Sequence, residues 1–312
     1  MRRLNRILGL VVVTVVALAL PAQGAFIYKT GARPASMGGS FVAVADDANA
    51  IFLNPSGLIQ LPGKELTITY ARLFPGVEDD KLHQGMVGFV LPMSGVGVIG
   101  LGWQTFSSDL WNDNAFTLSF AREITGSLSI GLNVRGMMWK ADLSGLEEKD
   151  LLGDSVSSGL KIGADLGALW RSPWQIKAGL FLKNVNKPDV ATGKETVNPT
   201  TGQKGTAPEA PLPMEIHAGL AYDLMEMLVS AQLISVDGDM RFTGGVERRF
   251  AGTGLSLSGG WSGGKDMEHR VNMGVGYQLR RIAINVSYLL YGDTFNPEVK
   301  DGDYSVSFGY KF

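Results

Sequence analysis

The sequence has no cysteine, only three histidines and almost no net charge. Its 312 residues carry a formal charge of −2 at pH 7. Without cysteine the chain can form neither a disulfide framework nor a thiol site, and His83, His217 and His269 lack the spacing of paired metal ligands. The balanced charge provides no basic surface for nucleic acid. We therefore expect no metal site, no cofactor and no nucleic-acid partner.

Long apolar runs are also scarce, and the one that stands out lies near the N-terminus. Arg2, Arg3 and Arg6 precede an apolar run over 7–20, which is followed by Pro21 and small residues. The run is shorter than the ~20 residues that a membrane-spanning helix needs, and its order of basic, apolar and small residues is typical of a secretory signal. We expect residues 1–24 to be a signal peptide. A buried N-terminal helix is the alternative.

From residue 65 to the end, apolar and polar residues alternate. Tyr304, Val306 and Phe308, for example, alternate with Ser305 and Ser307, and only a strand has this period of two. Segments of roughly ten residues, each long enough for a tilted strand to cross a bilayer, recur about fourteen times in the pattern typical of membrane barrels. They lie near 65–73, 84–93, 95–106, 115–124, 126–140, 157–172, 174–185, 214–224, 227–236, 239–250, 253–263, 268–280, 281–291 and 303–312.

The connections between these segments favour a barrel over a soluble β-sandwich. Every second connection is a tight turn, whereas those over 75–83, 107–114, 141–156, 186–213 and 292–302 are long. This asymmetry is typical of bacterial outer-membrane barrels. Tryptophans near strand ends are expected in the aromatic girdles, namely Trp103, Trp111, Trp170 and Trp174. The sequence thus predicts an all-β, transmembrane antiparallel barrel of about fourteen strands over 65–312, in contact with outer-membrane lipid.

One face of the predicted strands carries charged residues in positions that a dry core would not tolerate. Several glycines share this face, where they would allow another segment to approach the backbone closely. We therefore expect a narrow or filled interior. The residues expected to line a wet lumen are Arg135, Lys161, Asp165, Lys177, Glu215, His217, Arg241 and Glu247, and the glycines include Gly131, Gly163, Gly179, Gly245, Gly274 and Gly276.

Residues 25–64 do not alternate and need a place to pack. We expect one short helix that Asp46 caps, with Asp47 in its first turn, and that ends at Asn54 and Pro55. The barrel lumen is the obvious location for this hatch segment. Its two aspartates could pair there with wall cations, namely Arg135, Lys161, Lys177 and Arg241.

The same segment resembles a known family. Gly31-Ala32-Arg33, Met37-Gly38-Gly39, Ala45-Asp46-Asp47-Ala48 and Asn54-Pro55-Ser56-Gly57-Leu58 are similar to the N-terminal signature of the FadL-like superfamily, and within it most of all to PorV/PorQ-type proteins. The resemblance implies a fourteen-stranded outer-membrane barrel closed by an N-terminal hatch. FadL relatives pass hydrophobic molecules such as fatty acids, whereas PorV-type members are accessory proteins of type IX secretion. The implied hatch residues are Arg33, Gly38, Gly39, Asp46, Asp47, Asn54, Pro55 and Gly57.

Three further motifs match by chance. Residues 260–264 fit G-x-S-x-G, but no helix follows to form a nucleophile elbow. Residues 95–100 fit G-x-G-x-x-G inside a strand, where no helix presents its amides to a phosphate. The Asp-Gly pairs at 237–238 and 301–302 are ordinary turn residues and leave at most a weak surface ion site. We therefore expect no catalytic residue and no enzyme.

Two function classes remain for the mature chain. One is a channel that passes a hydrophobic small-molecule ligand past the hatch, and the other is a structural or accessory barrel that binds a secreted-protein partner. In either class Tyr310 and Phe312 form the aromatic C-terminal end that outer-membrane assembly machinery recognises in such barrels.

Overall fold

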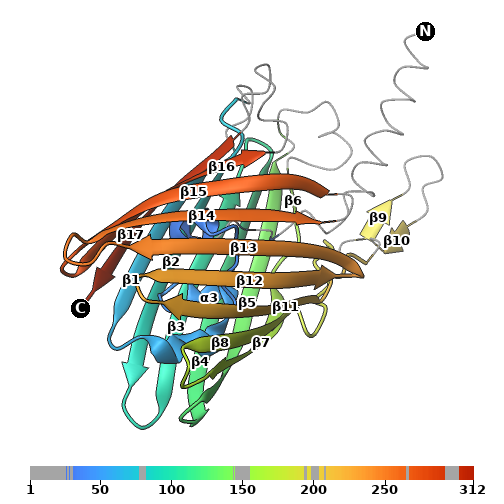
Figure 1. Ribbon diagram of the computed structural model, residues 1–312. Helices are drawn as coiled ribbons and strands as arrows, with labels where there is room; N and C mark the ends of the chain where they lie inside the picture. Colours follow the sequence, from blue (N-terminus) through green and yellow to red (C-terminus); the bar gives the residue numbers. More distant parts are fainter. Residues whose placement is uncertain are drawn as a thin grey trace.

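The computed structural model describes residues 26, 28, 31–76, 82–142, 144, 155–192, 195–197, 204–206, 209–264, 267–291 and 302–312. The expected signal peptide over 1–24 and the connection over 292–301 lie outside these residues. Fourteen long strands form the wall of a barrel (Figure 1). They are β1 (Glu65–Arg72), β2 (His83–Met93), β3 (Gly97–Ser107), β4 (Trp111–Thr125), β5 (Leu128–Asp142), β7 (Lys161–Arg171), β8 (Ile176–Lys183), β11 (Glu215–Leu224), β12 (Met227–Val236), β13 (Asp239–Arg249), β14 (Leu255–Gly264), β15 (Met267–Leu279), β16 (Ile282–Tyr291) and β17 (Gly302–Lys311).

The barrel closes where the last strand meets the first. β17 pairs antiparallel with β1 from Glu65↔Lys311 to Arg72↔Tyr304, and β1 also pairs with β2. Every other neighbouring pair is antiparallel as well. This closed antiparallel barrel of fourteen strands confirms the predicted fold class. Three short strands lie outside the ring: β6 (Ser155–Ser157) adds to the end of β5, and β9 (Glu195–Val197) pairs with β10 (Lys204–Thr206).

Side chains along each strand alternate between the outer surface and the lumen, because successive Cβ atoms point to opposite faces of a sheet. In β17, Val306 is 42% exposed on the outer face, whereas Ser307 is 3% exposed on the inner face. Ser307 is covered by the N-terminal residues, because its hydroxyl accepts a hydrogen bond from the backbone N–H of Ala32 at 2.8 Å. The outer face is an exposed apolar belt, which includes Ile68, Leu118, Ile130, Leu220, Val229, Val275 and Val286.

The connections partly follow the expected asymmetry. At the end of the barrel where β1 begins, all turns are tight, at 94–96, 126–127, 172–175, 225–226, 250–254 and 280–281. We call this the turn end. At the opposite loop end, 184–214 is long, but β3 and β4 extend until only 108–110 separate them. The expectation of a long loop over 107–114 is therefore wrong.

The N-terminal residues form short helical pieces inside the ring of strands, where Figure 1 shows α3. They are α2 (Ala32–Ser36), α3 (Ala50–Leu53) and the 3-10 helix η2 (Pro55–Gln60). Asn49 is the residue before α3, so Asp46 does not cap a helix as expected. Asp47 instead accepts the backbone N–H of Asn49 at 2.9 Å. No helix of the described residues is long and apolar enough to span a membrane.

The tryptophans divide between the two faces of the wall. Trp103 and Trp170 point outward and are 37% and 41% exposed, and Trp174 is exposed in a turn. Trp111 does not belong to a girdle, because its ring stacks on Trp139 with centroids 4.4 Å apart at the loop end of the barrel. Three of the four tryptophans expected in the girdles are therefore exposed, and Trp111 is not.

Candidate functional site

Residues 31–61, which we call the lumenal segment, lie against the inner wall of the barrel. Glycines of the wall make this close contact possible. A Cβ atom at Gly131 would overlap Ser56, one at Gly179 would overlap Val42, and one at Gly245 would lie 2.5 Å from the Met37 carbonyl oxygen. At these three positions the wall has no side chain, which lets the backbone of the segment lie directly against it.

Polar side chains of the wall bind the backbone of the lumenal segment directly. The Gln232 Oε1 atom accepts the N–H groups of Phe41 and Val42 at 3.1 and 2.9 Å. Asn133 donates to the Ile51 carbonyl at 2.9 Å, and Ser230 donates to the Ser40 carbonyl at 2.9 Å. These bonds satisfy backbone groups that the irregular segment cannot pair with itself, and they fix its position.

The residues of the hatch motif organise the segment itself. Asn54 donates to the carbonyl oxygens of Val42 and Ala168 at 2.7 and 3.2 Å, and its own carbonyl oxygen accepts the hydroxyl of Ser56 at 2.6 Å. Pro55 then begins η2. Gly57 has no room for a Cβ atom beside Ala45.

Two adjacent glycines of the motif turn the chain between α2 and Phe41. Gly38 and Gly39 have φ angles of +68° and +78°, which are unfavourable for residues with a Cβ atom. Gly38 also faces the backbone of Trp261 and Gly244 closely, so that a side chain at this position would clash with the wall. A glycine at position 38 is therefore required by both its backbone conformation and its surroundings.

Arg33 is the centre of the ion-pair cluster that joins the segment to the wall. Its guanidinium contacts Asp46 at 2.6 Å and Asp47 at 2.8 Å within the segment. It also donates to both carboxylate oxygens of Glu247 on β13, at 2.9 and 2.8 Å. Arg249 completes the cluster with contacts to Glu247 at 2.9 Å and Asp46 at 3.4 Å.

The charges in this cluster favour their ionised forms. Burial alone would raise the pKa of Asp46, but the Arg33 guanidinium, together with Arg249, holds that pKa well below its usual range. Burial would likewise lower the pKa of Arg33, and the carboxylates of Asp46, Glu247 and Asp47 raise it instead. Arg33 and Asp46 therefore stabilise each other in their charged forms.

The wall cations named from the sequence do not hold the two aspartates by ion pairs. Arg135 pairs with Asp165 at 2.8 Å, and Lys177 contacts Asp223 at 3.3 Å. Asp46 and Asp47 pair mainly with Arg33 of their own segment, because Arg33 lies between them and the wall. The expected pairing across the lumen is therefore wrong for these cations, and Arg249 is the wall cation that contacts Asp46.

The other predicted wall residues lie on the inward-facing side of their strands. Glu215 joins Lys183 at 2.7 Å and His217 at 3.0 Å, and His217 also packs edge-on against Phe181. Lys161 and Arg241 have the same inward parity on β7 and β13. None of these residues belongs to the cluster around Arg33.

An apolar cluster lies on the loop side of the lumenal segment. Phe26 is 2% exposed and packs with Ala115 and Met137 of the wall and with Val190 and Leu212 of the long 184–214 connection. Tyr28 and Trp139 pack against its edge. Burial, together with the nearby Asp113 carboxylate, raises the pKa of the Tyr28 hydroxyl, so that the hydroxyl stays neutral. The lumen here is lined mainly by apolar side chains.

Sequence reasoning missed several residues that hold the segment. Gln232, Asn133 and Ser230 were not selected, although each is a polar residue at an inward position of a predicted strand. Arg249 was missed because it lies at the very end of β13. Gln232, Asn133 and Ser230 could have been found by searching the inward-facing positions of the predicted strands for side chains that form hydrogen bonds.

These features define a closed fourteen-stranded barrel with a folded segment in its lumen. Solved structures with the same fold include the Ralstonia pickettii toluene transporter TbuX, at 13% identity with a TM-score of 0.65, which covers 90% of this chain and 98% of its own. The Pseudomonas putida toluene transporter TodX (13%, TM-score 0.63) and a Pseudomonas aeruginosa FadL homologue (11%, TM-score 0.62) each cover 92% of this chain and 99% of their own. No protein-family model and no curated protein matches the sequence.

Proposed function

We propose that the chain is an outer-membrane barrel that passes small hydrophobic molecules through its lumen when the lumenal segment moves. In this proposal residues 1–24 are a signal peptide, 25–64 the hatch and 65–312 the barrel. The exposed apolar belt supports the location, because a continuous apolar surface around a barrel is unfavourable in water and suits a bilayer. The turn end then faces the periplasm and the loop end faces outward.

One observation carries the transport function. Among the described residues, no strand of the barrel pairs with the lumenal segment, so beyond its covalent connection to β1 the segment is held by side-chain bonds, close packing and the Arg33 cluster. A segment attached in this way can move without any loss of strand pairing. The absence of strand pairing among the described residues supports a gated passage, in which the segment moves and the wall stays closed.

The apolar cluster around Phe26 supports a hydrophobic cargo. Its wall side chains, Ala115 and Met137, lie in the path between the loop end and the lumenal segment. The side chains of Phe26 and Tyr28, whose rings are 6.4 Å apart and edge to face, occupy this place in the structure. We infer that an aromatic or aliphatic molecule could replace them there. The toluene transporters that share the fold are consistent with such a cargo.

The test is the double variant Asp46→Ala/Asp47→Ala. It removes two of the three carboxylates that Arg33 contacts and leaves every strand intact. In cells that carry the protein in their outer membrane, we expect a phenylnaphthylamine dye to enter severalfold faster than with the unmodified chain. The matched control is Glu123→Ala/Glu226→Ala, which removes two exposed carboxylates at the same end of the barrel and should leave dye entry unchanged.

An accessory role of the PorV/PorQ type is the second candidate. The observation that favours it is the β9–β10 hairpin in the 184–214 connection at the loop end, which suits contact with another protein. In that case the same double variant should leave dye entry unchanged and reduce recovery of a secreted-protein partner. If neither quantity changes, the segment has only a packing role and both candidates lose their support.

We also propose that the assembly machinery of the outer membrane reads the C-terminal aromatic residues. Phe312 is 58% exposed, packs edge to face against Tyr310 at 4.9 Å and donates its backbone N–H to Lys64 at 3.0 Å. The aromatic end thus lies beside the first strand, where the barrel closes. Phe312→Ala should lower the amount of folded protein in the membrane, and unchanged insertion would contradict this role.

A further inference from the structure

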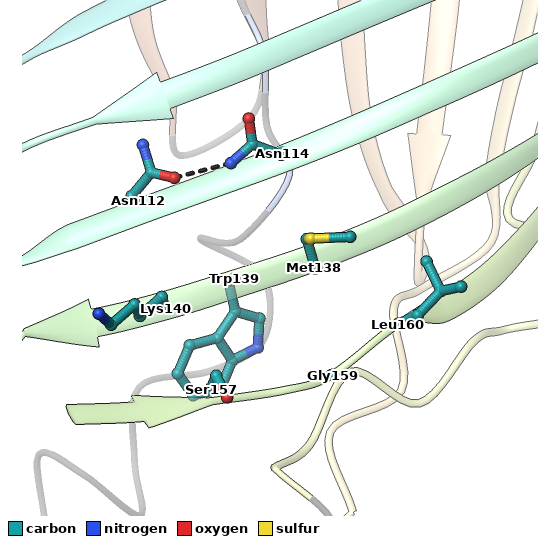
Figure 2. A pocket seen from close by; sticks show the side chains of 8 residues that line it. All are labelled: Asn112, Asn114, Met138, Trp139, Lys140, Ser157, Gly159 and Leu160. Atoms are coloured by element: carbon teal, nitrogen blue, oxygen red, sulfur yellow. Dashed lines mark hydrogen bonds between the residues drawn. The ribbon is translucent and has the colours of Figure 1, made fainter.

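A hollow of about 330 Å³ lies on the outer side of the wall at the loop end, and its lining residues come from β4, β5 and the segment from β6 to the start of β7 (Figure 2). Asn112 and Asn114 lie on one strand, and Met138, Trp139 and Lys140 lie on the next. The third side is made by Ser157, Gly159 and Leu160.

The β4 side of this hollow is polar, and its amides are held in place. Trp103 donates its indole N–H to the Asn114 carbonyl oxygen at 3.0 Å, and Asn114 donates to Asn112 at 2.7 Å. Asn112 donates in turn to the Phe106 carbonyl at 3.2 Å. Asn112 and Asn114 each use one amide N–H in these hydrogen bonds. Because an amide nitrogen carries two hydrogens, the second N–H of each asparagine is available for a ligand.

Lys140 adds a positive charge beside these amides. It pairs directly across the strands with Asn112 on one side and Ser157 on the other, and its side chain is exposed. Among the described residues no carboxylate lies within ion-pair distance of its ammonium group. The neighbouring acid on the same face is Asp142, which accepts the backbone N–H of Ser144 at 3.0 Å.

The lower part of the hollow is apolar. Met138 and Leu160 are 38% and 63% exposed and lie at the upper edge of the apolar belt. Gly136 lies on the same outer face of β5, two residues from Met138 toward the turn end. Because Gly136 has no side chain, Leu160 packs over its backbone. Lys140 and Asn112 pair nearest the loop end, and Met138 pairs with Asn114 closer to the turn end. A groove that is cationic toward the loop end and increasingly apolar toward the turn end has the polarity of a lipid that carries an anionic headgroup.

We propose that this hollow binds a phosphorylated glycolipid of the outer leaflet, with a phosphate at Lys140, headgroup hydroxyls at Asn112 and Asn114, and acyl chains over Met138 and Leu160. The inference rests on the proposed orientation of the barrel, because the loop end then faces the leaflet that is rich in such lipids. It does not depend on transport through the lumen.

Native mass spectrometry of the full chain, extracted in detergent and titrated with purified lipid A, tests the proposal. Lys140→Gln should weaken binding about tenfold, as expected for the loss of one charge-assisted hydrogen bond. The matched control is Arg122→Gln, because Arg122 has the same outward parity on β4 but lies near its turn end. This control should bind lipid A as the unmodified chain does.

Two further lipids sharpen the result. Dephosphorylated lipid A should bind the unmodified chain as weakly as lipid A binds the Lys140→Gln variant, because both lack the ion pair. Phosphatidylglycerol should bind more weakly than lipid A, since it lacks the sugar hydroxyls. Equal binding of lipid A to the Lys140→Gln variant, an equal loss with Arg122→Gln, or equal affinity for phosphatidylglycerol would each overturn the glycolipid site. None of these readouts depends on dye entry.

Discussion

Two buried arginines lie inside the same barrel and have opposite structural consequences. Arg135 on β5 pairs with Asp165 on the neighbouring β7, so its charge is matched within the wall. Arg33 instead pairs with Glu247 across the boundary between the lumenal segment and the wall. The first ion pair joins two strands of the barrel, and the second joins the lumenal segment to the wall. The same kind of arginine–carboxylate ion pair therefore holds two wall strands together in one place and holds the lumenal segment against the wall in the other.

The surroundings of Arg135 are more tightly connected and less exposed to water than those of Arg33. Asp165 also accepts the backbone N–H of Asn184 at 2.9 Å, and Asn184 donates to the Pro213 carbonyl at 2.8 Å, so both ends of the 184–214 connection are tied to the wall. Around Arg33, by contrast, Asp46 is 22% exposed and Arg249 is 54% exposed. Water therefore reaches the second cluster, which makes it the easier one to open.

The largest effect is expected within the wall. Asp165→Asn leaves the Arg135 charge buried without its partner, and breaking such a pair costs about 3–5 kcal/mol. The free energy of unfolding of the barrel, measured with urea in lipid vesicles, should fall by this amount. The matched control is Asp223→Asn, whose partner contact to Lys177 is 3.3 Å long and whose carboxylate is 40% exposed. A loss for Asp165→Asn no larger than that of the control would contradict the comparison.

A smaller and more local effect is expected at the boundary. Glu247→Gln removes the charged hydrogen bonds between Arg33 and the wall, which are worth about 1.5–3 kcal/mol. Because the chain has no cysteine, a single Ser40→Cys substitution reports on the lumenal segment alone. Ser40 is 1% exposed, so its replacement should react with a thiol reagent only when the segment moves.

In the Ser40→Cys background, Glu247→Gln should raise the labelling rate on the order of ten- to a hundredfold. The lost hydrogen bonds lower the free energy needed to move the segment away from the wall, and the labelling rate depends on that local opening. The unfolding free energy of the barrel should change far less. Glu226→Gln, in a turn at the same end, is the control. If labelling and global unfolding change in parallel, the segment and the wall are one cooperative unit and the comparison fails.

The sequence predicted the wall well because the wall depends on local periodicity. The alternation of Val306 and Ser307 needs only the geometry of a strand, and the fourteen segments follow from it. Close approach to the wall was also predictable, since Gly131, Gly179 and Gly245 sit at inward positions. In each case the signal lies within a few neighbouring residues.

The boundary was harder because its partners are distant in the chain. Arg33 and Glu247 were both singled out, but their pairing across 214 residues depends on how the segment lies in the lumen. The sequence suggested wall cations for Asp46 and Asp47, and it could not show that Arg33 would lie between them and the wall. Opposite charges can be paired in several ways, and only the three-dimensional arrangement selects one.

A change of pH should affect the boundary without affecting the wall to the same extent. The pKa of Asp46 is lowered in the folded protein, so its ionised form stabilises the attachment above the ordinary value of about 3.9. That contribution is lost as the pH falls through the lowered value. The Asp46 contribution should therefore raise dye entry into vesicles below about pH 4. Asp46→Asn should show raised entry already at pH 7 and no further rise below pH 4, and a rise below pH 4 that persists in Asp46→Asn would contradict the assignment to Asp46.

The smallest effect is expected at the exposed edge of the cluster. Arg249 contacts Glu247 at 2.9 Å and Asp46 at 3.4 Å, but its side chain is 54% exposed. An exposed ion pair contributes about 0–1 kcal/mol, because water and salt screen it. Arg249→Gln in the Ser40→Cys background should therefore raise the labelling rate by a factor of about five at most. This increase should disappear in high salt, whereas the increase caused by Glu247→Gln should persist because Arg33 and Glu247 are 12% and 3% exposed. An Arg249→Gln effect as large as that of Glu247→Gln would mean that the exposed arginine, and not Arg33, fastens the segment to the wall.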